Sequence, residues 1–291
     1  MIQVYDRRRK ALVDERECAV GGIRFLYNTR TGRILLKTVM YRKSFSNLYS
    51  TYEKSPLSKR KVKKFVRKFH ISTADCEQKK YRNFNDFFTR KRLKYLNGTT
   101  QDELPAIADS KLTVYSIDEG VRFSIKNSTY SVGELLENPA YAARFSGGLC
   151  LVFRLTPDDY HRYVYPDSGT QEPTVKIKGI LHSVNPISAD NNVYVRNSRQ
   201  WTVLHTEHFG ELVQIEVGAM LVGKIRNHYC YGGAYFSKLD EKGYFEYGGS
   251  TVVLLIPKDV VQIDEDILHY SRLGIESKVT IGDRIGVRIG G

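Results

Sequence analysis

The triplet Gly248-Gly249-Ser250 places a potential nucleophile directly after two small residues. Ser250 leads into the apolar, β-branched segment Thr251–Leu255, so the serine stands where a turn meets a predicted strand. No bulky neighbour shields the Gly249 carbonyl, which suits attack by Ser250 Oγ on its own preceding peptide bond. A tight turn before a buried strand explains the same residues without chemistry, because glycine supplies the positive φ that turns need. The local sequence leaves both interpretations open.

A serine nucleophile needs a base to remove its proton and a group that orients the base. The candidate base is His161, in Tyr160-His161-Arg162, and the candidate orienting group is Asp109. Each has a structural alternative. A histidine beside aromatic residues is often part of the core, and Asp109 is well placed to form an Asx turn before a strand at Leu112.

Other ligand-type residues do not indicate a metal site. His205-Thr206-Glu207-His208 lacks the helical HExxH spacing, and no cysteine pair accompanies it. The four cysteines, Cys18, Cys76, Cys150 and Cys230, are widely scattered. They are typical of free thiols in a reducing compartment. We therefore expect no metal and no disulfide.

Charge is divided unevenly along the chain. Residues 1–95 contain 26 lysines and arginines against 8 aspartates and glutamates, whereas residues 96–291 contain 19 against 24. A basic N-terminal part attached to a mildly acidic body favours a polyanionic partner. No recognised nucleic-acid motif is present, so we expect an anionic membrane surface and no nucleic acid.

The segment Lys59–Phe69 predicts a basic amphipathic helix, with Ser55-Pro56 marking its start. Its apolar residues recur at helical spacing: Val62, Phe65, Val66 and Phe69. The other faces are almost entirely basic, which is typical of helices that bind anionic membranes. Packing of the apolar face on the body is equally compatible with the pattern.

The chain has neither an apolar secretory signal at its start nor an apolar stretch near the ~20 residues of a membrane span. We therefore expect that any contact with a membrane is peripheral.

The remaining sequence predicts an α+β protein with a mainly-β core. Residues 1–33 are expected to be irregular, residues 34–52 helical and Ser131–Leu136 a short helix. Alternating segments between turn residues predict strands at Lys111–Ile117, Leu149–Leu155, Thr174–Ile180, Asn192–Val195, Trp201–His205, Leu212–Val217, Thr251–Ile256 and Lys278–Ile281. We expect a basic, largely helical membrane-associating region at 1–97 and a β-rich catalytic domain at 98–291.

Six motifs occur in the order found in the phosphatidylserine decarboxylase family, which the chain resembles over nearly its whole length. They are Phe84–Lys91, Ala108–Leu112, Asp159–Arg162, Ser183–Pro186, Glu216–Gly223 and Phe245–Val253. Any one of them alone would be a weak signal, but six in order are specific. The resemblance implies a β-rich core related to duplicated hybrid-motif proteins, as a barrel or sandwich, with added N-terminal helices.

The resemblance also implies a mechanism. Ser250 attacks the Gly249 carbonyl, a histidine removes its proton, and Asp109 fixes that histidine. The chain is cut between Gly249 and Ser250, and Ser250 becomes a covalent pyruvoyl group that forms a Schiff base with phosphatidylserine. This cofactor acts as an electron sink while carbon dioxide leaves and phosphatidylethanolamine forms. His161 delivers or relays the proton.

The same resemblance implies a heterodimer of the two cleavage products, with further homo-oligomerisation left open. It also implies a peripheral location on the cytoplasmic side of the cell membrane, where an anionic phospholipid is the substrate.

One position departs from the family pattern, which often has a second histidine in Tyr-His-x-x-His. Val164 occupies that position here, and valine cannot act as a base. Three histidines are then candidates for the activation of Ser250: His161, which we favour and which would serve both steps, His182 and His228. The remaining alternative is that processing is slow. Two alternative functions remain: a decarboxylase of the same family acting on another amine-bearing metabolite, and an unprocessed, non-catalytic membrane-binding homologue.

Overall fold

The computed structural model of this chain describes residues 2–15, 25, 29–35, 38, 43–77, 80–94, 98–125, 128–179, 193–218, 224–247 and 250–290. Most of its regular structure is strand. The largest sheet contains β1 (Gln3–Asp6), β2 (Ala11–Asp14), β4 (Ser110–Ser116), β7 (Leu149–Leu155), β9 (Gly169–Gln171), β10 (Val175–Ile177), β11 (Arg199–Thr206), β12 (Gly210–Gly218), β14 (Tyr235–Phe236), β16 (Ser250–Ile256) and β18 (Glu276–Val279).

The strands of this sheet follow the order β14-β9-β11-β12-β16-β7-β4-β18-β1-β2, and β10 pairs with β11. All neighbours are antiparallel except β1 and β18, which are parallel. Smaller sheets contain β13 (Ile225–Asn227), β15 (Glu241–Phe245) and β8 (Arg162–Val164); β17 (Val261–Ile263), β19 (Arg284–Arg288) and β3 (Glu103–Pro105); and β5 (Arg122–Ile125) and β6 (Ser128–Ser131).

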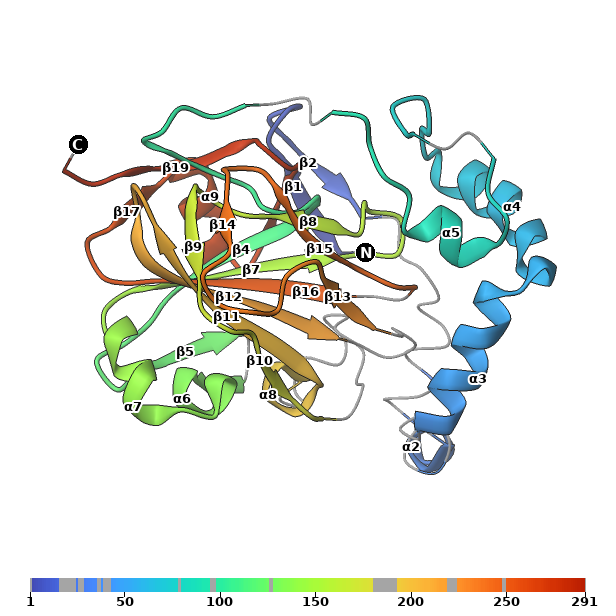
Figure 1. Ribbon diagram of the computed structural model, residues 1–291, viewed down its shortest axis with the longest axis horizontal. Coiled ribbons are helices and arrows are strands. Elements are labelled where there is room, and N and C mark those ends of the chain that lie inside the picture. The colour runs from blue at the N-terminus through green and yellow to red at the C-terminus, as the bar shows by residue number, and fades with distance from the viewer. Residues whose placement is uncertain are drawn as a thin grey trace.

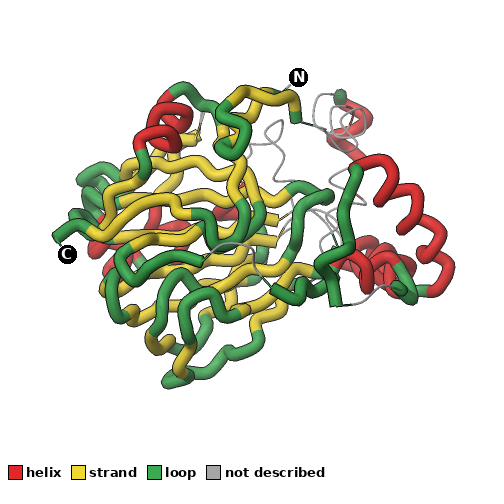
Figure 2. The backbone as a smooth tube through the Cα atoms, turned by 90° about the horizontal axis from the view of Figure 1, so that it is seen from above, coloured by secondary structure: helices red, strands yellow, loops and turns green. Residues whose placement is uncertain are grey.

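The helices are short, and those from the N-terminal part lie together at one side of the sheet (Figures 1 and 2). The N-terminal group consists of α2 (Arg30–Leu35), α3 (Lys43–Lys54), the 3₁₀ turn η2 (Pro56–Ser58), α4 (Lys59–Phe69) and α5 (Phe84–Phe88). The later helices are α6 (Val132–Leu136), α7 (Pro139–Ala142), the 3₁₀ turn η3 (Ala143–Phe145), α8 (Val193–Arg196) and α9 (Glu265–Arg272).

The expected α+β class with a strand-rich core is confirmed, but the expectation of a barrel is wrong for the described strands. Their path is open, because β14 at one end and β2 at the other each pair on one side only. A closed barrel would require these end strands to pair with each other.

Two local predictions are also wrong. Part of the segment expected to be irregular forms the hairpin of β1 and β2, which joins the large sheet through β18. Asn192–Val195, expected to be a strand, overlaps the one-turn helix α8. There, the β propensity of Val193-Tyr194-Val195 is outweighed by packing: Tyr194 is buried, and its ring meets the edge of Tyr130.

Helix α4 occupies the segment whose pattern predicted a basic amphipathic helix. Its partly buried Phe65 packs against Phe84 and Phe87 of α5, with ring centroids 5.2 and 6.0 Å apart. The expected cap is replaced by η2, because Ser55 Oγ donates to Tyr52 O at 2.7 Å instead of binding a helix N–H. The apolar face of α4 therefore packs on the body. Lys61 turns back to pair with Glu53, whereas the other basic residues of the helix are exposed.

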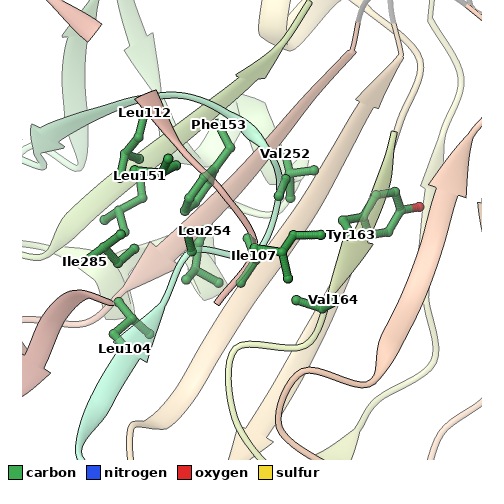
Figure 3. Packing of buried hydrophobic residues seen from close by; sticks show 14 of the residues in the cluster. Leu104, Ile107, Leu112, Leu151, Phe153, Tyr163, Val164, Val252, Leu254 and Ile285 are labelled. Carbon is green, nitrogen blue, oxygen red and sulfur yellow. The ribbon is translucent and has the colours of Figure 1, made fainter. Parts of the chain in front are cut away.

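The strand β16 lies at the centre of the large sheet and is buried along its whole length. Successive side chains point to opposite faces. Val252, Leu254 and Ile256 join one hydrophobic cluster, whereas Val253 and Leu255 join the other. Figure 3 shows Val252 and Leu254 in the first cluster. Ser250 therefore belongs to the face of Val252 and Leu254.

Candidate active site

Ser250 is the first residue of β16, and its hydroxyl is buried. Its Cα is paired with Gly218 on β12 and with Leu155 on β7. The residue is fully buried, and Oγ forms no hydrogen bond with any described residue. A buried hydroxyl with no hydrogen bond is costly, and one at this position is available to react with the preceding peptide bond.

Gly248 and Gly249, which precede the serine, lie outside the described residues. The residue before them is fixed by α5, since Tyr247 N donates to Asn85 Oδ1 at 3.2 Å. The Tyr247 ring also meets the edge of Phe84 at 5.0 Å between centroids. The motif around α5 therefore anchors the chain just ahead of the predicted cleavage site.

His161 lies beside this same segment. Its carbonyl accepts a hydrogen bond from Phe245 N at 2.9 Å. Its imidazole packs against Phe88, with ring centroids 3.8 Å apart, and Phe88 in turn contacts Tyr247 at 5.0 Å. The tertiary structure thus brings His161 to the chain that leads into Ser250, although the two are far apart in sequence.

The hydrogen bonding of His161 identifies its tautomer. Nδ1 lies 3.0 Å from the carbonyl oxygen of Asp159. A carbonyl oxygen only accepts, so Nδ1 carries the proton and Nε2 has the free lone pair. Nε2 is buried and has no partner among the described residues. Burial, helped by the positive charge of Arg90 and opposed by Asp159, lowers the pKa of His161 to about 3. The imidazole is therefore neutral at physiological pH and able to accept a proton at Nε2.

Asp109 contacts groups other than the predicted histidine. Its Oδ1 accepts from Ile281 N at 2.9 Å, and its Oδ2 pairs with Arg92 Nη2 at 2.7 Å. The Arg92 guanidinium also lies over the Tyr160 ring, 4.4 Å from its centroid. Within the part of the chain that the structure describes, no hydrogen bond joins Asp109 to His161. The orienting role of Asp109 remains a prediction.

The carboxylate nearest to His161 along the chain, Asp159, is held by a set of contacts that the sequence did not suggest. Its oxygens accept from Lys111 Nζ at 2.7 and 2.9 Å and from Thr156 N and Oγ1 at 2.7 and 2.8 Å. Burial alone would raise the pKa of Asp159, but Lys111 and Thr156 lower it below its usual value. The sequence did contain one signal for this ion pair, because Lys111 is a charged residue at the start of a predicted core strand, Lys111–Ile117, and a buried charge needs a partner.

The other candidate histidines have different surroundings from His161. Val164, which stands where the family often has a second histidine, is buried in β8 opposite Glu241. His228 Nε2 lies 2.5 Å from Glu241 Oε1, and its side chain is partly exposed. His182 lies outside the described residues. Among the histidines that the structure describes, only His161 is both fully buried and free at one ring nitrogen.

The histidine pair considered for metal binding is engaged elsewhere. His205 Nε2 lies 3.1 Å from Glu172 Oε1, and His208 Nδ1 lies 3.0 Å from Asp167 Oδ1. In the described ranges, no group of three or more potential ligands is positioned to hold a metal ion.

The depressed pKa of His161 predicts a pH-dependent stability. The unfolded chain binds a proton below about pH 6.5, whereas the folded chain resists protonation down to about pH 3. Stability is therefore full above pH 6.5 and falls as the pH is lowered through this window. We expect a loss of about 2 kcal/mol from this group between pH 7 and pH 5.

Urea unfolding measures this loss in chains that carry Ser250→Ala, which keeps the polypeptide intact. The loss should be absent when His161→Gln is added, because glutamine does not titrate. An equal pH dependence with and without His161 would contradict the prediction.

Comparison with known proteins identifies a single family. The sequence model of the family described as phosphatidylserine decarboxylase matches residues 84–287, from the start of α5 almost to the end of β19. The chain is 44% identical to phosphatidylserine decarboxylase proenzyme 2 of Clostridium acetobutylicum over 98% of both chains. It is 39% identical to the phosphatidylserine decarboxylase proenzyme of Desulfitobacterium hafniense over 99% of both. It is also 39% identical to that of Clostridium perfringens, over 98% of this chain and 99% of the relative.

The family match includes Asp109, His161 and Ser250, and the relatives align across the N-terminal part as well. Agreement over nearly the full length of the chain leads to one assignment. The chain belongs to the phosphatidylserine decarboxylase family.

Proposed function

We propose that this chain is the proenzyme of a pyruvoyl-dependent decarboxylase, which cuts itself between Gly249 and Ser250 and then converts phosphatidylserine to phosphatidylethanolamine and carbon dioxide. The observation that supports it most is the buried Ser250 Oγ at the start of β16, which forms no hydrogen bond with any residue that the structure describes. The naming of the relatives as proenzymes supports the maturation step.

In the maturation step, Ser250 Oγ attacks the carbonyl carbon of Gly249, and Nε2 of His161 takes the hydroxyl proton. The peptide C–N bond breaks, the nitrogen of residue 250 receives a proton, and an ester remains. Removal of the α-proton of residue 250 then breaks the ester C–O bond and frees the Gly249 carboxylate. Water replaces the nitrogen of the resulting dehydroalanine, ammonia leaves, and a pyruvoyl group is left at position 250.

The surroundings of Ser250 fit such a group, because Ser250 is fully buried and the nearby Leu155 and Val252 belong to the apolar core. A pyruvoyl group supplies a carbonyl that takes up the electron pair left by departing carbon dioxide. We assign to Nε2 of His161 the relay of the proton that replaces the carboxylate on the product. The neutral imidazole and its fixed tautomer suit a proton carrier.

Intact mass under denaturing conditions tests the proposal. We expect two chains, residues 1–249 and residues 250–291, with the smaller one lacking a free α-amino group. A single uncut chain after purification would refute self-processing. Product analysis with phosphatidylserine and with soluble amino acids separates the proposed substrate from other amine-bearing metabolites.

The position of β16 supports a tight complex of the two cleavage products. The smaller product would begin with β16, which pairs with β12 on one side and β7 on the other, and would also contain α9, β17, β18 and β19. Since β16 is buried at the centre of the large sheet, the cut leaves most of its contacts in place. We propose that the products remain a heterodimer in the absence of denaturant.

We also propose that α4 binds anionic membranes. Six of its basic side chains are exposed and form no ion pair with a described residue: Lys59, Arg60, Lys63, Lys64, Arg67 and Lys68. Leu48 and Leu57, in the preceding helix and turn, are 72% and 75% exposed. Among the described residues, no helix is long and apolar enough to cross a membrane. Exposed leucines beside an unpaired basic face suit peripheral binding.

Vesicle sedimentation measures this interaction. The double variant Lys63→Gln/Lys64→Gln should bind vesicles containing anionic lipid about 30-fold more weakly, since each lysine contributes about 1 kcal/mol. The matched control Lys176→Gln/Lys178→Gln removes two exposed lysines in and just after β10 and should bind normally. Binding by the chain that is insensitive to salt and to anionic lipid content would contradict the proposal.

Four further parts of the proposal depend on the sequence alone. They are a hybrid-motif-like ancestry of the core, the division into residues 1–97 and 98–291, further homo-oligomerisation, and a location on the cytoplasmic face of the cell membrane. Limited proteolysis, size-exclusion chromatography and cell fractionation test the last three.

A further inference from the structure

The loop Thr156–Tyr160 carries the hydrogen-bond partner of His161, and a buried lysine from another strand holds it. We infer that the ion pair of Lys111 and Asp159, here called the clamp, positions His161 for proton transfer. It does so by fixing the Asp159 carbonyl that accepts the hydrogen bond from His161 Nδ1. This inference deepens the proposed function and depends on it. Lys111 and Asp159 act through His161, so they are positioning residues.

The clamp has a well-defined geometry. Lys111 is only 6% exposed, and its ammonium contacts both oxygens of Asp159, at 2.7 and 2.9 Å, and Thr156 Oγ1 at 2.6 Å. A more distant contact joins it to Glu15 at 3.9 Å. The same Asp159 carboxylate accepts from Thr156 N and Oγ1 and so closes the loop on itself. The side chain of Asp159 is thus fixed from both strand and loop.

Fixing this side chain also fixes the backbone of the same residue. The carbonyl of Asp159 accepts from His161 Nδ1 at 3.0 Å and from Arg90 Nη2 at 3.2 Å. If the carbonyl rotated away, Nδ1 would lose its acceptor, and the imidazole could change tautomer or turn. A base must lie within hydrogen-bond reach of its proton, so a small displacement of this loop is expected to slow catalysis.

The ion pair is poorly explained by stability alone. A buried pair must repay the desolvation of two charges, and apolar residues of similar size are often as stable. Although burial would lower the pKa of Lys111, nearby Asp159 and Asp158 raise it, so the lysine stays charged. Asp109, whose partners are Arg92 and Ile281, does not duplicate this role. A positioning function accounts for why the pair lies next to the base.

The test follows cleavage of newly made chains over time by cell-free translation. Lys111→Met leaves a buried carboxylate unpaired and frees the loop. We expect its cleavage to be about 100-fold slower, the cost of a displacement near 1 Å at a reacting group. In the double variant Lys111→Met/Asp159→Asn, the amide oxygen still accepts from Thr156, and no unpaired charge remains. Its rate should recover at least tenfold relative to Lys111→Met.

The matched control is Arg154→Met. Arg154 lies directly opposite Lys111 in the register of β4 and β7, is equally buried, and pairs with Glu15 and Glu276. Its loss should lower the thermal unfolding temperature but leave the cleavage rate within about threefold of the original chain. A rate that followed thermal stability across all variants would show a merely structural role for Lys111 and overturn the inference.

Hydroxylamine identifies the step that is affected, because it cleaves an ester but not a peptide bond. If His161 is displaced, Ser250 is not activated, and hydroxylamine should release no fragment from the slow Lys111→Met chains. Accumulation of a hydroxylamine-sensitive ester would place the defect after the attack and contradict the inference. Failure of the unaltered chain to cleave would instead refute the proposed function, which keeps the two ideas separable.

Discussion

Ser250→Ala is expected to remain a single chain of 291 residues under conditions in which the unaltered protein is fully cut. Alanine keeps the strand and its burial but removes the only oxygen that can attack the Gly249 carbonyl. Removal of a nucleophile in a catalytic unit lowers rates by several orders of magnitude, so we expect a decrease of at least about 10⁴-fold. Denaturing mass spectrometry after a long incubation measures it.

The neighbouring residue supplies a close control. Thr251 Oγ1 is also buried and unpartnered among the described residues, yet its side chain points to the opposite face of β16. Thr251→Ala should therefore be cut at the normal rate. Cleavage of Ser250→Ala at the same peptide bond would show that another group, or another protein, makes the cut.

The second large effect is expected for His161→Gln. Glutamine can preserve a hydrogen bond to the Asp159 carbonyl but cannot take a proton from Ser250. General-base catalysis contributes about 10²–10⁴-fold, and we expect self-cleavage to slow by this factor. Because the pKa of His161 is about 3, far below the working pH, maturation should be slow even in the unaltered chain. Time courses of cleavage after cell-free translation measure both rates.

His228→Gln is the matched comparison, since His228 was the other candidate base that the structure describes. It is bound to Glu241 and partly exposed, so its replacement should leave the cleavage rate nearly unchanged. A slow His228→Gln chain together with a normal His161→Gln chain would transfer the role of base to His228. Normal rates in both would direct attention to His182.

Local patterns predicted the parts of the site that belong to one strand or one helix. The strand at Thr251–Ile256 followed from its β-branched run, and Ser250 proved to be its first residue. The residues Lys59–Phe69 are helical in the structure, with the predicted apolar side turned to the body. Such features depend on a spacing of two or of three to four residues, which can be read directly from a sequence.

The partners of polar groups could not be predicted in this way. Asp109 was expected at His161 but pairs with Arg92, and the anchoring of His161 depends on Asp159 and on Lys111 from a different strand. Periodicity identifies the face on which a side chain lies, whereas its partner depends on register and loop conformation. The β1 hairpin at the edge of the sheet was missed for a related reason, since β1 pairs with β18 near the far end of the chain.

The sequence by itself determined the family and predicted the nucleophile and the cut, because ordered motifs and a glycine-serine junction before a strand are local features. Only the tertiary structure decided which groups surround that nucleophile. Among the described residues, it left Ser250 Oγ and His161 Nε2 buried without a hydrogen-bond partner, and it paired Lys111 with Asp159, whose carbonyl accepts from His161. The physical reason is that hydrogen bonds and burial arise between segments distant in sequence, where no spacing rule applies.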